Sequence, residues 1–285
     1  LKPFRDLEKQ GFIVTRLPVD RQGLVDPEQL SQAIRPDTLL ISIMLANNEF
    51  GTIQPIKKLA KIAKEQRVLF HSDAVQAIGK IEVDVQELDV DLLSLSGHKM
   101  YGPKGIGALY IRKGIVVDPL IHGGGQELGL RSGTENVPAI VGLGKACELV
   151  AKGLRAGDPD KIAKLRNYLG ERVLAMIPEA WKNNPDFYCL PNTLNLTLPG
   201  IRGESLVLLL DRQNIFISSG SACKSGSPEP SHALLALGLS TEETHCTVRF
   251  SLGASTTRDD IDYTVEALEE LFHNSLGDIR FVPCR

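Results

Sequence analysis

A lysine at the end of an apolar run is the first residue of this chain whose setting suits chemistry. The run 91–96 is typical of a buried strand, and Gly97, His98 and Lys99 follow it directly. An amine at the mouth of a buried strand can condense with an aldehyde when its surroundings keep it uncharged. A lone lysine in a polar turn is usually only a solvated surface residue, so the chemical interpretation depends on partners elsewhere in the chain.

A second candidate is the thiol of Cys223, which lies in the segment SSGSACKSGSPEP, residues 218–230. Small residues surround this cysteine, and the glycines and prolines of the segment oppose regular structure. The neighbouring Lys224 favours the thiolate, which is the nucleophilic form of cysteine. The setting predicts a reactive thiol on a mobile arm. Cys147 lies among apolar helical residues, which is typical of an inert thiol, and the other three cysteines are also expected to be structural.

Arg249 is the third candidate, because it interrupts the otherwise apolar segment 248–252. A guanidinium in a buried strand needs an anionic partner. The spacing alone leaves open whether this partner is a carboxylate of the protein or one that belongs to a ligand.

Polar clusters follow three apolar runs that are typical of buried strands. The runs span residues 38–45, 68–71 and 91–96, and the clusters are 47–51, 72–76 and 96–99. A helical pattern at 55–64 separates the first two runs, and this alternation predicts an α/β domain with a mostly parallel sheet and helices on both faces. Ligands collect at the carboxyl ends of such strands, so the clusters are expected at one edge, although each alone could be ordinary turn chemistry.

The rest of the chain predicts a second, smaller unit. A strand is expected at 12–17, and the second half of the chain has helical patterns at 134–152, 158–177 and 204–213, with strands at 193–198 and 215–218. We expect residues 1–135 to be the remainder of a large domain. Residues 136–285 are expected to form a small C-terminal α/β domain that carries the cysteine loop.

Composition narrows the classes of function. The chain is 42% hydrophobic and 24% charged, as in ordinary globular proteins, and no apolar run is long enough to span a bilayer. A net charge of −3 gives no reason to expect nucleic acid or a membrane surface as partner. The five cysteines are odd in number and contain no Cys-x-x-Cys pair, which predicts reduced thiols in a cytoplasmic compartment and no metal site.

Six motifs occur together in the order NNE, SDAVQ, SGHKMYGPKG, RSGTEN, SSGSACKS and VRFSLG. With them the chain resembles the cysteine desulfurases, which are pyridoxal-phosphate enzymes with the aspartate-aminotransferase-like fold, PLP fold type I. The likeness covers nearly the whole chain and is closest to the branch with a long cysteine loop, which supplies sulfur for iron–sulfur cluster assembly. It implies conversion of L-cysteine to L-alanine, with a persulfide on Cys223 that passes to an acceptor or scaffold protein.

The resemblance also implies cofactor roles for residues of the second and third polar clusters. Lys99 would form the internal aldimine with pyridoxal 5'-phosphate and would move the substrate α-proton. Asp73 would pair with the pyridinium nitrogen, which keeps the ring an effective electron sink, and Gln76 would donate to the phenolic oxygen. Ser96 would bind the phosphate, together with His98, which we also count among the catalytic residues.

Substrate roles and a homodimer follow from the same resemblance. Asn48, which also borders the cofactor, and Arg249 would hold the substrate carboxylate, whose shape matches the planar guanidinium fork. Thr134 would reach the phosphate bound by the other subunit, so the active unit would be a homodimer. Cys223 would attack the γ-sulfur of the bound substrate.

One part of the family pattern is not found in this sequence. The glycine/threonine phosphate-binding turn and the histidine that stacks on the ring precede the position that matches Leu1, so we expect an N-terminal portion to be missing and cofactor retention to be weak. Two alternatives to a cysteine desulfurase stay open. One is a selenocysteine lyase, and the other is a truncated, non-catalytic partner protein, against which the intact set of Lys99, Asp73, Gln76, Cys223 and Arg249 argues.

Overall fold

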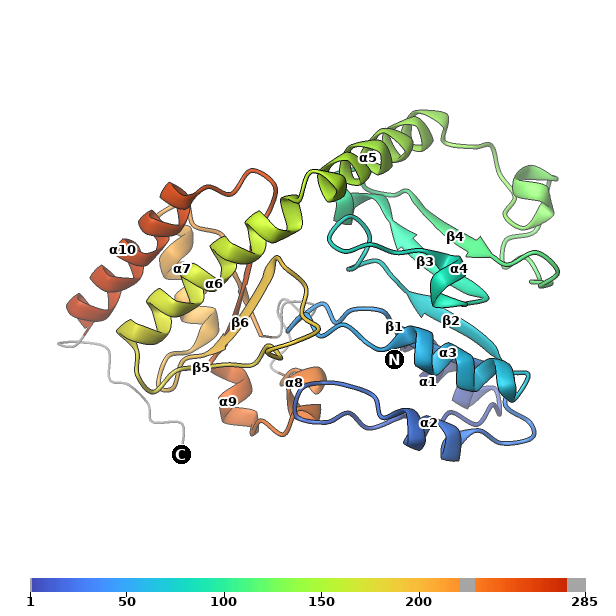
Figure 1. Ribbon diagram of the computed structural model, residues 1–285, viewed down its shortest axis with the longest axis horizontal. Coiled ribbons are helices and arrows are strands. Elements are labelled where there is room, and N and C mark those ends of the chain that lie inside the picture. Colours follow the sequence, from blue (N-terminus) through green and yellow to red (C-terminus); the bar gives the residue numbers. More distant parts are fainter. Residues whose placement is uncertain (1, 221–228, 276–285) are drawn as a thin grey trace.

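The computed structural model describes residues 2–220 and 229–275, and the side chains of residues 273–275 are outside the description. The predicted nucleophile Cys223 therefore lies outside the described residues. Two four-stranded sheets form two halves of the molecule, and the long helices α5 and α6 follow one another along both halves (Figure 1).

The elements of the first half are α1 (Lys2–Lys9), α2 (Pro27–Ala33), β1 (Leu40–Met44), α3 (Ile56–Glu65), β2 (Leu69–Asp73), α4 (Val85–Leu88), β3 (Leu92–Ser96), η1 (Gly97–Met100), β4 (Gly107–Ile111) and η2 (Gln126–Gly129). The remaining elements are α5 (Val137–Arg155), α6 (Asp158–Met176), β5 (Trp181–Lys182), β6 (Thr193–Thr197), α7 (Gly203–Asp211), β7 (Ser218–Ser219), α8 (His232–Ala236), α9 (Thr241–His245), β8 (Thr247–Ser251) and α10 (Arg258–Ser275).

The first sheet has the strand order β1-β2-β3-β4, with β1, β2 and β3 parallel and β4 antiparallel to β3. Its core lies on the face where Ile41, Phe70 and Leu93 pack with Ile56 and Leu59 of α3. Because strand side chains alternate between faces, the neighbouring positions of the same strands point to the opposite face. The predicted α/β class with a mostly parallel sheet is confirmed.

The second sheet has the order β5-β6-β8-β7, and all of its pairs are antiparallel. Helices α6 and α7 contact this sheet and α10 packs against α6, which buries Val173, Leu196, Val248 and Val265 completely. The two sheets lie on either side of the predicted boundary at residues 135 and 136. The division into two domains itself stays a prediction.

Helix starts follow the expected capping chemistry, because side chains can satisfy backbone N–H groups that lack an intrahelical partner. The Asp26 side chain accepts from the N–H of Glu28 at the start of α2, and the Asn136 side chain accepts from the N–H of Ala139 at the start of α5. The predicted strand at 12–17 is wrong. These residues form no ladder with any described strand, and Phe12 and Ile13 are exposed.

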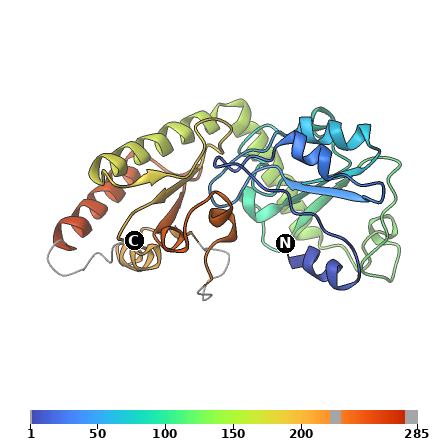
Figure 2. The ribbon, with the colours of Figure 1, turned by 90° about the horizontal axis from the view of Figure 1, so that it is seen from below.

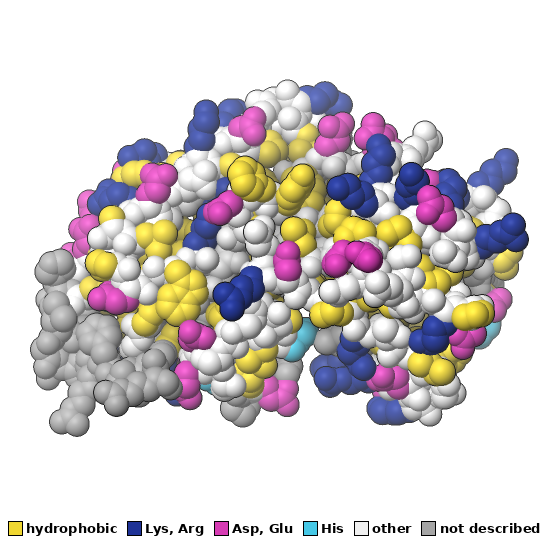
Figure 3. Space-filling model, turned by 60° about the horizontal axis from the view of Figure 1, so that its bottom comes forward, with side chains coloured by type: hydrophobic (Ala, Val, Ile, Leu, Met, Phe, Trp, Pro, Cys, Tyr) yellow, Lys and Arg dark blue, Asp and Glu magenta, His cyan; other side chains and the backbone are white. Residues whose placement is uncertain are grey.

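Charges of both signs are mixed over both halves on the face drawn in Figure 3. None of the helices in the described part of the chain has the length and apolar character needed to cross a membrane. Seen from below in Figure 2, the two halves lie side by side, and the N-terminal helix α1 lies beneath the first half.

Candidate active site

The three polar clusters lie at one edge of the first sheet, as the sequence predicts. The ladder pairs Met44 with Asp73, and Asp73 with Ser94, so the carboxyl ends of β1, β2 and β3 are level. Figure 1 shows that this edge faces the second sheet. The predicted cofactor residues therefore have the second half of the molecule opposite them, which is the usual place for a ligand in an α/β sheet.

Asp73 is the last residue of β2 and begins a tight turn. Its Oδ1 accepts a hydrogen bond of 3.0 Å from the N–H of Val75, and the N–H of Ala74 donates to the carbonyl of Ser94 at 2.9 Å. These bonds fix the carboxylate at the strand end. An acidic oxygen held there is available to a protonated ring nitrogen of a ligand.

Lys99 lies in the short 3-10 helix η1 and is exposed. The turn depends on Gly97, where an added Cβ would lie only 3.0 Å from the Ile106 side chain and 3.2 Å from the Pro103 carbonyl. Ser96 and His98 contact each other through a bond of 2.8 Å between Oγ and Nδ1. The structure therefore places the two predicted phosphate-binding side chains next to one another, beside the lysine.

Lys99 lines an open cavity of about 650 Å³, together with Lys80, Tyr101, Asn192 and Leu252. This volume is in the range of small-molecule sites, and the lining comes from both halves of the molecule. Of the predicted site residues, Lys99 belongs to this lining. Asp73 and Ser96 are the last residues of β2 and β3, Gln76 lies in the turn after β2, and none of the three is in this lining.

Positive charges gather around this cavity. Burial, together with smaller effects of the nearby charges of Lys99 and Arg249, lowers the pKa of Lys80 to about 8. Cations held close together in a partly buried site are stabilised when an anion binds between them. The residues present thus fit an anionic ligand such as a phosphate ester, and the Lys99 amine beside the cavity suits a ligand that also carries an aldehyde.

Arg249 joins the two halves of the site. It lies on β8 and donates from Nη1 to the carbonyl oxygen of Asn48 at 2.6 Å and from Nη2 to Oγ of Ser218 at 3.1 Å. The two residues that were predicted to hold a substrate carboxylate are therefore in contact. Their role as carboxylate ligands stays a prediction.

Two asparagines that the sequence analysis missed hold the first polar cluster against the second sheet. Asn184 donates to the carbonyl of Phe50 at 2.7 Å, and Asn195 donates to the carbonyl of Glu49 at 3.1 Å. The main chain adds a bond of 2.8 Å from Leu190 N–H to the carbonyl of Gly51. A polar side chain within the wholly buried strand β6 was the signal that could have indicated Asn195.

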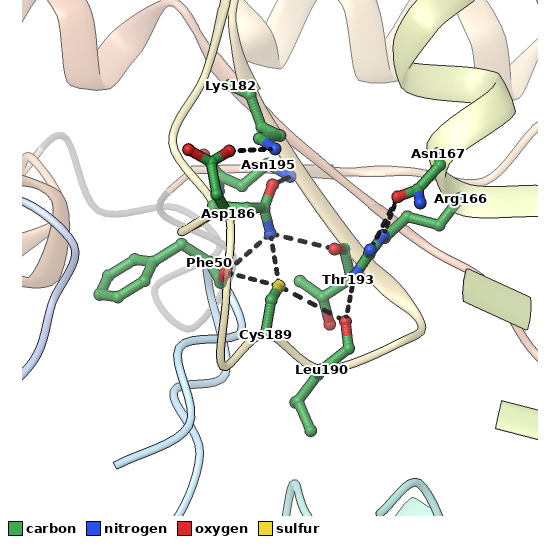
Figure 4. Close-up of polar contacts among 10 residues, drawn as sticks. Phe50, Arg166, Asn167, Lys182, Asp186, Cys189, Leu190, Thr193 and Asn195 are labelled. Carbon is green, nitrogen blue, oxygen red and sulfur yellow. Dashed lines mark hydrogen bonds and ion pairs between the residues drawn. The ribbon is translucent and has the colours of Figure 1, made fainter. Parts of the chain in front are cut away.

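The thiol of Cys189 belongs to the same network. Its Sγ lies 3.4 Å from Nδ2 of Asn184 and 3.4 Å from the Leu190 carbonyl. Figure 4 shows Cys189 between Phe50 and Leu190, with Thr193 close by. Burial raises the pKa of this thiol. Cys189 is therefore a poor nucleophile, as expected of a structural cysteine.

Glu49 of the first cluster is buried and bonds to the residue that begins α8. Its Oε2 accepts a hydrogen bond of 2.5 Å from Oγ of Ser231, whose Oγ also caps the helix at the N–H of Leu234. Burial raises the pKa of Glu49, against the opposing effects of Ser231 and Arg249. This bond fixes the start of α8 against the first polar cluster.

Thr134 is exposed and lies three residues before Val137, the first residue of α5. It is not among the residues that line the cavity beside Lys99. Its assignment to a site on another subunit stays a prediction.

His71 on β2 bridges the neighbouring strands. Its Nδ1 and Nε2 each lie 2.8 Å from a hydroxyl oxygen, that of Ser42 on β1 and that of Ser94 on β3. Burial lowers the pKa of His71, with a smaller opposing effect from Asp73. In a range of mildly acidic pH, His71 is therefore neutral in the folded protein but protonated in the unfolded chain.

We expect this histidine to make folding weaker in acid. Stability attributable to His71 falls as the pH drops below its ordinary pKa of 6.5, because the unfolded state then binds more protons. In urea titrations at a series of pH values, His71→Gln should show a smaller loss of unfolding free energy between neutral and acid pH than the wild type. Replacement of the exposed His122 by Gln is the matched control, and an unchanged pH profile in His71→Gln would contradict the prediction.

The comparisons with known proteins agree with this geometry. The chain belongs to the aminotransferase class-V family, which matches residues 1–264. Within this family its relatives are cysteine desulfurases. It is 51% identical over 271 residues to cysteine desulfurase IscS of Dictyoglomus turgidum, covering 95% of this chain and 68% of that protein. It is 54% identical over 265 residues to cysteine desulfurase IscS of Methanosarcina thermophila, covering 93% of this chain and 65% of that protein.

Solved structures show the same fold. A NifS-like protein superposes with a TM-score of 0.89 at 40% identity, covering 96% of this chain and 72% of the other. SspA in complex with cysteine gives a TM-score of 0.75 at 41% identity, covering 90% and 71% of the two chains. This chain thus spans about two thirds of the length of these relatives, and 57% of the human cysteine desulfurase, to which it is 45% identical over 264 residues.

Proposed function

We propose that this chain removes sulfur from L-cysteine with the help of pyridoxal phosphate, giving L-alanine and a persulfide on Cys223. The observation that supports this most strongly is the position of Lys99, beside a cavity in which the charges of Lys80 and Arg249 also act. The family relationship supports the same reaction. Because the chain spans only about two thirds of its relatives, the activity of the whole protein is part of the proposal.

Each role in the proposal is taken by a residue of this chain. When bound, pyridoxal phosphate supplies an electron sink for charge that develops at the substrate Cα. Lys99 would hold the cofactor through its amine and would accept and return the proton at the substrate Cα, and Asp73 would hold a proton on the ring nitrogen. Ser96 and His98, whose side chains contact each other, would bind the phosphate.

Arg249 and Asn48 are the residues proposed to bind the substrate carboxylate. We expect Arg249→Lys to raise the KM for L-cysteine about tenfold or more, because a lysine cannot present two parallel N–H groups to a carboxylate and a hydrogen bond to a charged group contributes roughly 1.5–3 kcal/mol. The KM is measured from the steady-state rate of alanine formation. The exposed Arg212→Lys is the matched control, and a KM equal to that of the wild type would remove Arg249 from the substrate site.

We further propose that the enzyme acts as a homodimer in a cytoplasmic, reducing compartment and passes its sulfur to an acceptor or iron–sulfur scaffold protein. Exposure of Thr134 is compatible with a role in a second subunit, and Cys147, Cys189 and Cys246 are free thiols in the described structure. The structure of SspA, a neighbour in fold, is a complex with cysteine, and this supports cysteine as a substrate of the present chain.

A visible absorption spectrum tests the proposal. The chain is mixed with pyridoxal phosphate, and the spectrum is recorded before and after addition of L-cysteine or L-selenocysteine. A visible band that changes with L-cysteine supports the enzyme. A response to L-selenocysteine alone would favour the lyase, and no band in any condition would favour a non-catalytic partner protein.

A further inference from the structure

Lys80 has no part in the roles described so far, although it lines the same cavity as Lys99. It follows the turn after β2, and its Nζ donates to the backbone carbonyl of Gln76 at 2.8 Å and to Oε1 of Gln76 at 3.2 Å. Both distances are within the range of real hydrogen bonds. Lys80 thus holds the residue that is predicted to meet the phenolic oxygen of the cofactor.

The chemistry of the two side chains determines which end of the amide is held. A lysine ammonium has three donors and no acceptor, whereas a glutamine amide has an accepting oxygen at one end and a donating NH₂ group at the other. The amide end beside a charged lysine is therefore the oxygen. The NH₂ end is left for a partner that accepts a hydrogen bond, and a phenolic oxygen is such a partner.

The position of Lys80 is unfavourable for its own charge. Burial, Lys99 and Arg249 all act against the ammonium form, and together they lower the pKa to about 8. The amine is still mostly protonated at neutral pH, so the interaction with Gln76 is present there. A lysine kept where its surroundings disfavour its charge is a candidate for a role in the site.

We propose that Lys80 is a positioning residue, which holds the carbonyl oxygen of the Gln76 amide so that its NH₂ group is the end presented to the phenolic oxygen of pyridoxal phosphate. This inference rests on the proposed function for the identity of the ligand. The contact between Lys80 and Gln76 is a property of the chain without the cofactor.

The first test needs no cofactor. The side-chain amide signals of Gln76 are followed by NMR in the isotope-labelled chain between about pH 6 and 10, a range that brackets the titration of a shifted lysine. We expect them to shift with a midpoint of about 8 in the wild type and to lose this response in Lys80→Met. Lys145→Met is the matched control, because Lys145 lines the same cavity but bonds to Glu148. A Gln76 amide that ignores pH, or that titrates unchanged in Lys80→Met, would overturn the proposal.

The second test compares the binding of pyridoxal phosphate with that of an analogue that lacks the ring hydroxyl group. Lys80→Met should weaken the binding of pyridoxal phosphate about fivefold more than it weakens the binding of the analogue, the effect of one neutral hydrogen bond. Gln76→Leu should produce the same difference between the two ligands, and the double variant should not increase this difference. Equal weakening of both ligands would mean that Lys80 only attracts the phosphate, which contradicts the proposal. If the wild type bound neither ligand while the Gln76 amide titrated as expected, the proposed function would fail and the contact would stand.

Discussion

Lys99→Ala is expected to abolish the visible absorption band that the protein gives with pyridoxal phosphate. The amine of Lys99 is the group that the turn η1 places beside the cavity, and alanine cannot bond to the aldehyde. The measurement is an absorption spectrum of the variant after mixing with the cofactor and removal of the excess. The exposed Lys104→Ala, in the same turn-rich segment, should keep the band.

The same variant should lose alanine formation by at least about 10³-fold, because both the covalent attachment and the proton transfer depend on this amine. A band close to that of the wild type in Lys99→Ala would show that another lysine reacts with the cofactor. Lys80, which lines the same cavity, would then be the first to examine.

Cys223→Ser is expected to separate cofactor binding from sulfur removal. The variant should keep the visible band and its change on addition of L-cysteine, because the residues assigned to the cofactor are untouched. It should lose nearly all alanine formation, since a serine hydroxyl is a far weaker nucleophile than a thiolate towards sulfur. Alanine is quantified after incubation with L-cysteine.

Two other cysteines serve as controls for that experiment. Cys189, whose thiol pKa is raised by burial, and Cys147, whose Sγ contacts Sδ of Met100 at 3.7 Å, should tolerate replacement by alanine without loss of the reaction. Turnover at the wild-type rate in Cys223→Ser would exclude Cys223 as the nucleophile.

The strands and helices of the first sheet could be predicted from sequence because their signals are local. Continuous apolar runs predicted β1, β2 and β3 within a few residues, and the helical pattern at 55–64 predicted α3. The edge that carries Asp73 and Ser96 followed from the rule for parallel strands. The run at 12–17 has the same local signal, yet it lies without a neighbouring strand to pair with, so only the tertiary structure could decide it.

Contacts between distant segments could not be predicted in this way. Asn184 and Asn195 bond to residues 134 and 146 positions away, and no periodic pattern connects such positions. For Arg249, the sequence predicted that a partner is needed but not which residue the partner is. The need of this arginine for an anionic partner was expected from its setting in a buried strand, but its contacts with two neutral groups, the Asn48 carbonyl and the Ser218 hydroxyl, required the structure. Lys80 was overlooked because its importance depends on Gln76, Lys99 and Arg249 acting together.

The most direct test of the proposed reaction is mass spectrometry of the peptide that contains Cys223, after the chain has been incubated with pyridoxal phosphate and L-cysteine. We predict a gain of one sulfur atom on Cys223, formed together with an equal amount of L-alanine, and neither product in Lys99→Ala. Alanine formed without any sulfur on Cys223, or no alanine at all, would contradict the account.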